Sequence, residues 1–119
     1  MSNINSCLDN LLGLDGAMCC ALVDANSGMV LGQAGTGVDM ELAAAGNTEV
    51  MRAKMKTMSS LKLSDRIEDI LITLGKQYHI IRPVLSKPGL FFYYVLDKSR
   101  SNLALARRKC QEVETDLQV

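Results

Sequence analysis

The chain has 119 residues, of which 48% are hydrophobic and 22% charged, with 13 basic and 13 acidic side chains. This length and composition predict one globular domain, 1–119, with a single core. Because the basic and acidic residues are equal in number, the chain has no net positive charge to attract nucleic acid. This excludes a typical nucleic-acid-binding protein.

The beginning of the chain lacks the features of a targeting segment. Residues 1–14 have no basic start and include Asp9, so they resemble neither a secretory signal nor a transit peptide. The longest unbroken apolar run, 16–23, is much shorter than the ~20 residues that cross a bilayer. We therefore expect a cytoplasmic protein with no membrane partner.

A short amphipathic helix and a hairpin are the first predicted elements. Apolar residues recur at helical spacing through 4–12, and Gly13 follows as a stop signal. The run AMCCALVD, 17–24, is apolar at both alternating positions, which is typical of a strand covered on both sides. A polar turn, ANSG, leads into a second strand, 29–33.

The segment LGQAGTGVD, 31–39, has the glycine spacing of a phosphate-binding loop. Such a loop also needs a lysine and a hydroxyl to complete the phosphate and metal contacts. Here Gly37 is followed by Val38 and Asp39, so a carboxylate stands where phosphate oxygens would approach. We expect Asp39 to cap the next helix instead, and we predict no cofactor.

The longest predicted element is a helix over 40–61 with a wide face that is mostly apolar. On a helical wheel this face contains Met40, Ala43, Ala44, Asn47, Val50, Met51, Lys54, Met55, Met58 and Leu61. Two interpretations stay open, because the whole face could be core or part of it could pack on a partner. Methionine suits both roles, since its flexible side chain fills irregular gaps and adapts to binding surfaces.

Three further strands are predicted in close succession, as an antiparallel meander over 67–75, 78–85 and 90–97. Pro83 has no N–H group to donate, so the end of the middle strand must be kinked, bulged or bonded on one side only. The first run carries charges typical of a sheet edge, at Asp65, Arg66, Glu68 and Asp69.

The chain ends in a predicted helix whose apolar stripe repeats over 103–117. Asp97, Ser99 or Ser101 could cap its start. The basic triplet 107–109 is either a phosphate-binding patch or a solvated helical face balanced by nearby acids, and the second interpretation is favoured.

The cysteines and the single histidine form no recognisable metal site. Cys7, Cys19, Cys20 and Cys110 include no C-x-x-C pair, and only His79 could assist them. We expect buried thiols, with Cys19 and Cys20 on opposite faces of one strand. Cys7 and Cys110 lie on helical stripes that would meet if the two terminal helices pack side by side.

The order of elements predicts an α+β protein in which one antiparallel sheet is covered on both faces. The sequence resembles the Roadblock/dynein light chain family, of the bacterial type, over nearly its whole length. The resemblance rests on VDANSGMVLG, IEDILITLGKQYHIIRP and LFFYYVLDKSRSNLALARRK and on the spacing between them. It implies a single Roadblock-like domain with a five-stranded sheet in the order 2-1-5-4-3. The long helix would lie alone on one face, and the two terminal helices on the other.

The resemblance also implies a homodimer in which the third strands pair edge to edge and the two long helices lie together. We assign the dimer interface to Met51, Lys54, Met55, Met58, Glu68 and Ile70. Family members scaffold or regulate small Ras-like GTPases, or serve as light chains of dynein. Some bacterial members stimulate GTP hydrolysis by a partner without supplying an arginine finger. We assign partner docking to Glu49, Arg52 and Lys56.

Three functional hypotheses follow. The first is a non-catalytic homodimeric module that regulates or scaffolds a cytoplasmic small Ras-like GTPase. In that case, charge reversal at Arg52 or Lys56 should leave folding intact and weaken only partner binding. The second is a structural adaptor, like a dynein light chain, without effect on nucleotide turnover. The third is an enzyme or small-ligand sensor, supported only by His79 with Cys19, Cys20 or Tyr78 as possible neighbours.

Overall fold

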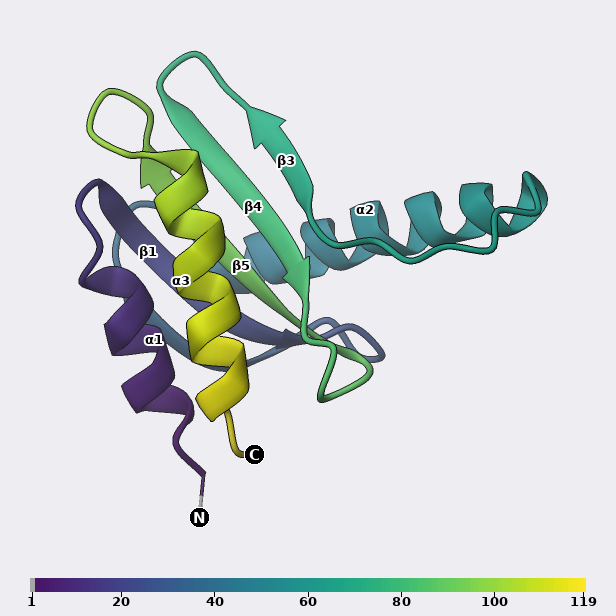
Figure 1. The fold of residues 1–119 in the computed structure, drawn as a ribbon, viewed down its shortest axis with the longest axis horizontal. Helices are drawn as coiled ribbons and strands as arrows, with labels where there is room; N and C mark the ends of the chain where they lie inside the picture. Colours follow the sequence, from purple (N-terminus) through teal and green to yellow (C-terminus); the bar gives the residue numbers. More distant parts are fainter. Residues whose placement is uncertain (1) are drawn as a thin grey trace.

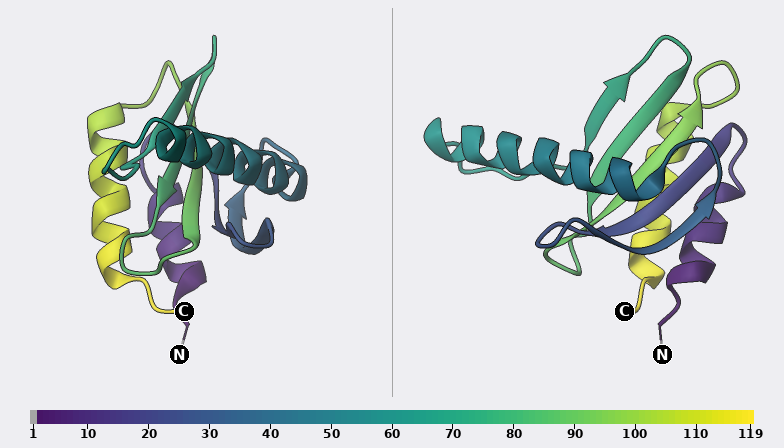
Figure 2. Two further views of the ribbon diagram at one scale, coloured as in Figure 1. Left: turned by 90° about the vertical axis from the view of Figure 1, so that its right-hand side faces the viewer. Right: turned by 180° about the vertical axis from the view of Figure 1, so that it is seen from behind.

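One antiparallel sheet separates two unequal helical layers (Figure 1). The computed structural model describes residues 2–119. Its elements, in chain order, are α1 (Ile4–Leu12), β1 (Ala17–Asp24), β2 (Met29–Gly35), α2 (Met40–Ser60), β3 (Ile70–Thr73), β4 (Gln77–Pro83), β5 (Leu90–Asp97) and α3 (Leu103–Asp116). The five strands have the order β2-β1-β5-β4-β3. Helix α2 covers one face, and α1 and α3 lie side by side on the other (Figure 2). The predicted fold class, strand order and helix placement are confirmed.

The adjacent strands β1 and β5 are buried on both faces because nearly all their side chains are apolar. Cys19 faces the core beneath α2, while its neighbour Cys20 faces α1 and α3, as the alternation of a strand requires. All four cysteines are buried free thiols. Burial raises the pKa of Cys20 and of Cys110 to about 12, so both thiols stay protonated and unreactive at neutral pH.

The core on the α1 and α3 side contains most of the large aliphatic side chains. Its largest members are Leu8, Leu11, Leu22, Ile80, Phe92, Tyr94 and Leu96. The buried hydroxyl of Tyr94 donates a hydrogen bond to the backbone carbonyl oxygen of Leu11. This bond joins α1 to a strand inside the sheet and satisfies the one polar atom of the tyrosine side chain.

The edge strand β3 is shorter than predicted. It covers Ile70–Thr73 instead of 67–75, because 61–69 forms an irregular connection after α2. All four charged residues associated with this run, including Glu68 and Asp69 inside the predicted strand, therefore lie ahead of β3. β3 is nevertheless an edge of the sheet, as the charges indicated.

Pro83 ends β4 and is bonded on one side only. It pairs with Phe91 of β5, whereas the pairing between β3 and β4 stops at Ile81. One-sided bonding was among the arrangements predicted for this proline, and it needs no donor from the proline nitrogen.

The helix caps confirm one prediction and correct another. Asp39 caps α2, accepting a hydrogen bond from the Leu42 N–H group at 3.2 Å. The cap of α3 is Asn102, whose Oδ1 accepts from the Leu105 N–H group at 3.1 Å. The predicted caps were wrong, because Asp97 accepts its hydrogen bonds from Ser99 inside the preceding turn.

Two glycines, one at the end of a strand and one in a helix, allow a matched test of the backbone conformation. Gly35 ends β2 with φ +80°, and a β-carbon there would overlap the Met18 carbonyl oxygen. Gly46 lies in α2 with open space around it. We expect Gly35→Ala to lower the free energy of unfolding by at least about 2 kcal/mol. Gly46→Ala should raise it by about 0.5–1 kcal/mol, since alanine is the better helix former.

Chemical denaturation of the two alanine variants beside the wild type measures both effects. Changes of the same sign would show that the backbone at one of these glycines differs from the structure.

Candidate functional site

Helix α2 is anchored to the sheet only through its first half (Figure 2). Its buried residues are Met40, Ala44, Thr48 and Met51, spaced three or four positions apart on one face. From residue 52 to residue 60, every side chain except the half-buried Met58 is exposed. These residues form the projecting half of α2, which extends beyond the sheet on the side of β3 (Figure 1).

The residues of α2 that were predicted for the dimer interface differ in how far their side chains are exposed. Met51 is only 3% exposed and packs in the core of its own chain. Met55 is 57% exposed, Lys54 is exposed and Met58 is half-buried. A partner could therefore contact Lys54, Met55 and Met58 directly, whereas Met51 would support that contact from behind.

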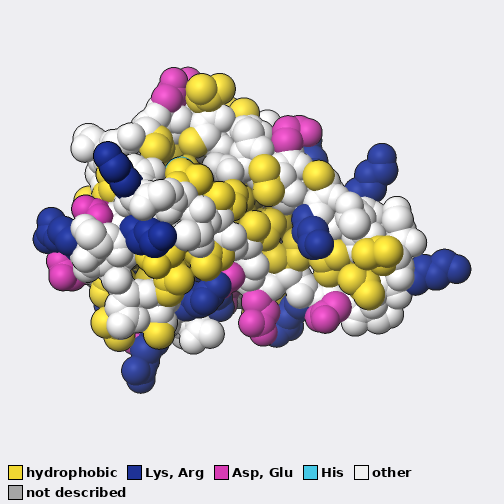
Figure 3. All heavy atoms as spheres, turned by 90° about the horizontal axis from the view of Figure 1, so that it is seen from above, with side chains coloured by type: hydrophobic (Ala, Val, Ile, Leu, Met, Phe, Trp, Pro, Cys, Tyr) yellow, Lys and Arg dark blue, Asp and Glu magenta, His cyan; other side chains and the backbone are white. Residues whose placement is uncertain are grey.

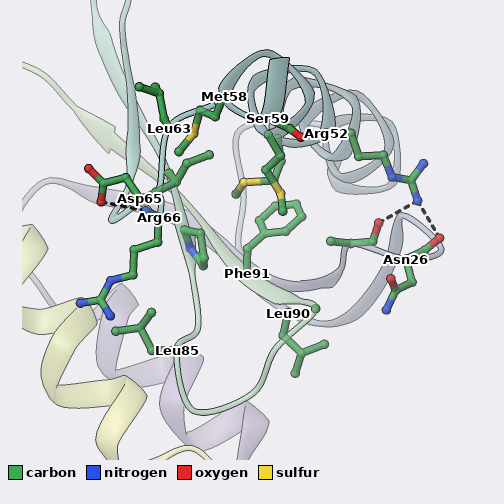
Figure 4. A pocket seen from close by; sticks show the side chains of 16 residues that line it. Asn26, Arg52, Met58, Ser59, Leu63, Asp65, Arg66, Leu85, Leu90 and Phe91 are labelled. Carbon is green, nitrogen blue, oxygen red and sulfur yellow. Dashed lines mark hydrogen bonds between the residues drawn. The ribbon is translucent and has the colours of Figure 1, made fainter. Parts of the chain in front are cut away.

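A groove of about 550 Å³ lies between α2 and the connection that follows it (Figure 4). Its apolar lining includes Met51, Met55, Met58, Leu63, Ile67 and Phe91. Phe91 points into the groove from the sheet, and Met58 points into it from α2. The charged side chains of Arg52, Asp65 and Arg66 also line the groove. The groove therefore offers apolar contact with charged groups around it.

The outer edge of β3 lies close to this groove in the fold. Among residues 2–119, β3 pairs only with β4, so one side of its backbone has no strand beside it. Ile70 begins the strand and is half-buried, and Glu68 is exposed just before it. The two surfaces predicted for the dimer interface, one on α2 and one at β3, therefore lie at the same end of the sheet (Figure 1).

Asp69 holds the start of β3 through a cluster of ion pairs. Arg107 of α3 donates from Nε and Nη2 to the two carboxylate oxygens at 2.9 and 3.1 Å. Arg82 of β4 donates from Nη1 at 3.2 Å. The side chains of Asp69 and Arg82 are only 11% and 12% exposed, and the hydrogen bonds to Asp69 raise the pKa of Arg107. Asp69 thus turns inward rather than lying at the solvated edge, and Arg107 is not simply part of a solvated face.

The Arg52 guanidinium holds the turn between β1 and β2 against α2. Its Nη2 donates to the carbonyl oxygens of Ala25 and Asn26 at 2.8 and 2.7 Å (Figure 4), and its Nη1 donates to Glu49 at 3.4 Å. The Ala25 N–H group in turn donates to the Gly89 carbonyl oxygen. Arg52 therefore has a structural role, and the structure indicates that its charge reversal would also lower the stability of the fold, whereas the prediction from sequence had only partner binding affected.

The other two predicted docking residues are freely placed on α2. Glu49 is exposed and pairs only with Arg52, and Lys56 is exposed on the projecting half. Among residues 2–119, neither side chain forms a hydrogen bond or ion pair outside α2. Their docking role stays a prediction.

His79 lies in a chain of hydrogen bonds, not beside a nucleophile. Its Nδ1 is 2.8 Å from the Tyr93 hydroxyl, and its Nε2 is 2.8 Å from Oε1 of Gln77. Because an amide oxygen only accepts, Nε2 carries the proton and Nδ1 accepts from the tyrosine. Burial lowers the pKa of His79 and so favours the neutral ring. Both ring nitrogens have structural partners, and no hydrogen bond in residues 2–119 joins His79 to Cys19 or Cys20.

Within residues 2–119, no group of three His, Cys, Asp or Glu side chains could hold a metal ion. None of the helices in the same residues is both long enough and apolar enough to cross a membrane. The candidate site is formed by the projecting half of α2, the groove and the edge of β3, where exposed side chains and an outer strand edge lie together.

Several solved structures have the same architecture at low sequence identity. A Roadblock/LC7 domain from Streptomyces avermitilis matches with a TM-score of 0.85 and 10% identity, over 97% of this chain and 94% of that chain. MglB from Myxococcus xanthus matches with a TM-score of 0.80 and 21% identity, over 95% and 89% of the two chains. A structure described as MglB with a tetrameric arrangement matches at 0.81 and 15%, over 96% and 84%.

No family model and no curated protein matches the sequence. The three structural matches each cover between 95% and 97% of this chain, with TM-scores between 0.80 and 0.85. The chain therefore has the Roadblock/LC7 fold, which is the fold implied by the resemblance of its sequence.

The structural role of Arg52 generates a testable difference between two basic residues of α2. Arg52→Ala removes two hydrogen bonds from a half-exposed guanidinium to turn carbonyls. We expect it to lower the free energy of unfolding by about 1–2 kcal/mol. Lys56→Ala, one helical turn further on, should change it by less than about 0.5 kcal/mol. Urea denaturation compares the two variants, and equal losses would contradict the role assigned to Arg52.

His79 generates a prediction about pH. Its pKa in the folded chain lies below the ordinary value of 6.5, so the folded state favours the neutral ring. The stability that depends on this neutral ring is complete above pH 6.5 and is lost as the pH falls through the folded pKa. Because the chain has one histidine, His79→Gln should flatten the decline in stability just below pH 6.5.

Denaturation of the wild type and His79→Gln over a series of pH values measures that slope. Identical slopes in the two proteins would mean that other groups cause the decline.

Proposed function

We propose that the chain is a non-catalytic homodimeric module that regulates or scaffolds a small Ras-like GTPase in the cytoplasm. The observation that carries this proposal is the projecting half of α2, residues 52–60, which is exposed around most of its surface. Helices in proteins owe most of their stability to packing of an apolar face. A helical half that lacks this packing inside its own chain is suited to packing on another chain.

The first partner in the proposal is a second copy of the chain. Lys54, Met55 and Met58 of α2, supported by Met51, meet the same residues of the copy across a two-fold axis. The edges at Glu68 and Ile70 pair at the same time. A two-fold contact repeats one patch on both subunits, and the free edge of β3 offers backbone groups that such pairing satisfies. The tetrameric arrangement described for MglB supports self-association of this fold.

The second partner is a small Ras-like GTPase, and the nucleotide is bound by that partner. The glycine-containing segment 31–39 of this chain supports this assignment, because it lacks the lysine that a phosphate-binding loop requires. Its only carboxylate, Asp39, caps α2 instead. The GTPase docks on the outer side of the paired long helices, at Glu49 and Lys56 and beside Arg52. The Roadblock fold and the resemblance to bacterial members of the family support this partner. As the resemblance implies, the module acts on the GTPase without inserting an arginine finger.

Met55→Glu tests the homodimer. Met55 is 57% exposed in the single chain, so glutamate should leave the fold intact. In the dimer the two copies of this glutamate would lie near each other across the two-fold axis, and their desolvation and mutual repulsion oppose association. Light scattering across a dilution series should show a dimer for the wild type and a monomer for the variant.

Leu105→Glu is the matched control, because Leu105 is 51% exposed on α3, on the other face of the sheet. Its mass should equal that of the wild type. A monomeric wild type, or an unchanged mass for Met55→Glu, would overturn the proposed dimer.

The effect on the partner is measured as the rate of GTP hydrolysis by candidate small Ras-like GTPases from the same cell. A rate that rises with the concentration of the module and then saturates would support regulation. Binding without a change in rate would support scaffolding, or the alternative of a structural adaptor like a dynein light chain. If no GTPase binds, the GTPase part of the proposal is wrong.

A further inference from the structure

The strand that pairs in the proposed dimer has only a short ladder within its own chain. β3 contains four residues, Ile70–Thr73, and pairs with β4 from Ile70 opposite Ile81 to Thr73 opposite Tyr78. A slip of one residue along this ladder would exchange the two faces of the strand. So short a pairing resists a slip, or fraying of the strand from its start, only weakly. The position of β3 therefore depends on contacts outside the ladder.

Asp69 continues the register of this ladder with its side chain. The last pair of the ladder joins Ile70 to Ile81. One position further on, Asp69 lies opposite Arg82, and Nη1 of Arg82 donates to Oδ2 of Asp69 at 3.2 Å. Opposite charges at facing positions of two strands stabilise their pairing. The ion pair thus begins where the backbone pairing between β3 and β4 ends.

Helix α3 holds the same carboxylate. Arg107 donates from Nε and Nη2 to the two oxygens of Asp69 at 2.9 and 3.1 Å, and a fork of this kind fixes direction as well as charge. Further along α3, Glu114 accepts a hydrogen bond from the Leu85 N–H group, just after β4, at 2.7 Å. Helix α3 is therefore tied both to the start of β3 and to the segment that follows β4.

The two faces of β3 show why Asp69 fixes the register. Ile70 and Ile72 pack in the core beneath α2, whereas Leu71 packs in the core with α1 and α3. Because side chains alternate along a strand, Asp69 shares the face of Leu71, toward Arg107. A slip of one residue would turn the carboxylate toward the apolar core beneath α2, where an unpaired charge is strongly unfavourable. Asp69 is thus compatible with one register only.

The proposed pairing of two copies depends on that register. Figure 3 shows hydrophobic side chains exposed between the sheet and the far end of α2. A second copy has to meet the edge of β3 and the projecting half of α2 at the same time. One residue along a strand is about 3.4 Å, which is more than a hydrogen bond tolerates. An edge displaced by one residue would therefore lose one contact or the other.

We infer that Asp69 is a positioning residue for the homodimer. Held by Arg82 and Arg107, it fixes the register of β3 and so places the outer edge that pairs with a second copy. This inference rests on the proposed function for the second copy, and it adds the residue that prepares the chain for pairing. Without the carboxylate, the two arginines lose their shared anion and repel each other, which releases the start of β3.

Two variants of the full chain remove the contact in different ways. Asp69→Asn keeps the size of the side chain and removes its charge. Arg107→Lys keeps the charge and removes the fork, at a position that is 39% exposed. The matched control is Asp15→Asn, which breaks an ion pair with Arg100 of similar length, 3.1 Å, between side chains that are 78% and 68% exposed.

Two measurements are made on each protein. Hydrogen exchange, resolved by residue with NMR, reports how often β3 opens, and light scattering over a dilution series gives the dissociation constant of the dimer. In Asp69→Asn we expect exchange at 70–73 to accelerate at least about tenfold, and the dissociation constant to rise at least about tenfold. Arg107→Lys should show smaller changes of the same sign. Exchange in β1 and β5 should stay as in the wild type, because only the edge opens, and Asp15→Asn should change neither measurement.

The pattern of exchange distinguishes positioning from general stabilisation. Equal acceleration in β1, β3 and β5 would overturn the inference, since Asp69 would then stabilise the whole fold. Unchanged exchange at 70–73 would overturn it, and so would faster exchange with an unchanged dissociation constant.

The same data separate this inference from the proposed function. A wild type that is monomeric at every concentration would count against the proposed dimer, and exchange at 70–73 would then decide alone whether Asp69 fixes the register of β3. A GTPase that ignores the module, with both measurements as expected, would count against the GTPase part of the proposed function and support the role of Asp69.

Discussion

The structure depends on the burial of β1 and β5 on both faces. A strand that is apolar on both sides must be covered twice, so one face is covered by α1 and α3 and the other by α2. The core beneath α2 is met by its first half only, through Met40, Ala44 and Met51. The helix is nevertheless 21 residues long. The part of α2 that no strand in residues 2–119 covers is the part with the exposed Met55, beside the groove.

Two polar contacts fix the position of that surface. Arg52 joins α2 to the turn after β1 at the point where the helix leaves the sheet. Asp69 joins the start of the edge strand to β4 and α3. The connection 61–69 between them has no regular structure of its own. Asp69 holds the end of this connection by charged hydrogen bonds, whereas its start at Leu61 lies at the far end of the projecting half.

The sequence predicted the elements and their order because period and alternation are local signals. The methionine spacing of α2, the two-sided apolar run of β5 and the cap at Asp39 could all be recognised within a few residues. The roles of Arg52 and Asp69 could not, since their partners lie 27 and 38 positions away. Local signals also misled at β3, where Asp69 has the charge of a solvated edge but is buried by arginines that only the fold brings near.

The projecting half of α2 also has a mechanical consequence. At a rise of about 1.5 Å per residue, Ser60 lies about 13 Å beyond Met51, the last buried residue of the helix. The helix is therefore a lever that pivots near Met51, with one arm packed on the core and the other in solvent. A tilt of about 5° at Met51 would displace the far end by about 1 Å, which is enough to disturb a close-packed contact. A small change in packing beneath Met51 is thus carried to the far end of the helix as a displacement. That displacement would alter a contact with a partner even when the free energy of unfolding of the chain is almost unchanged.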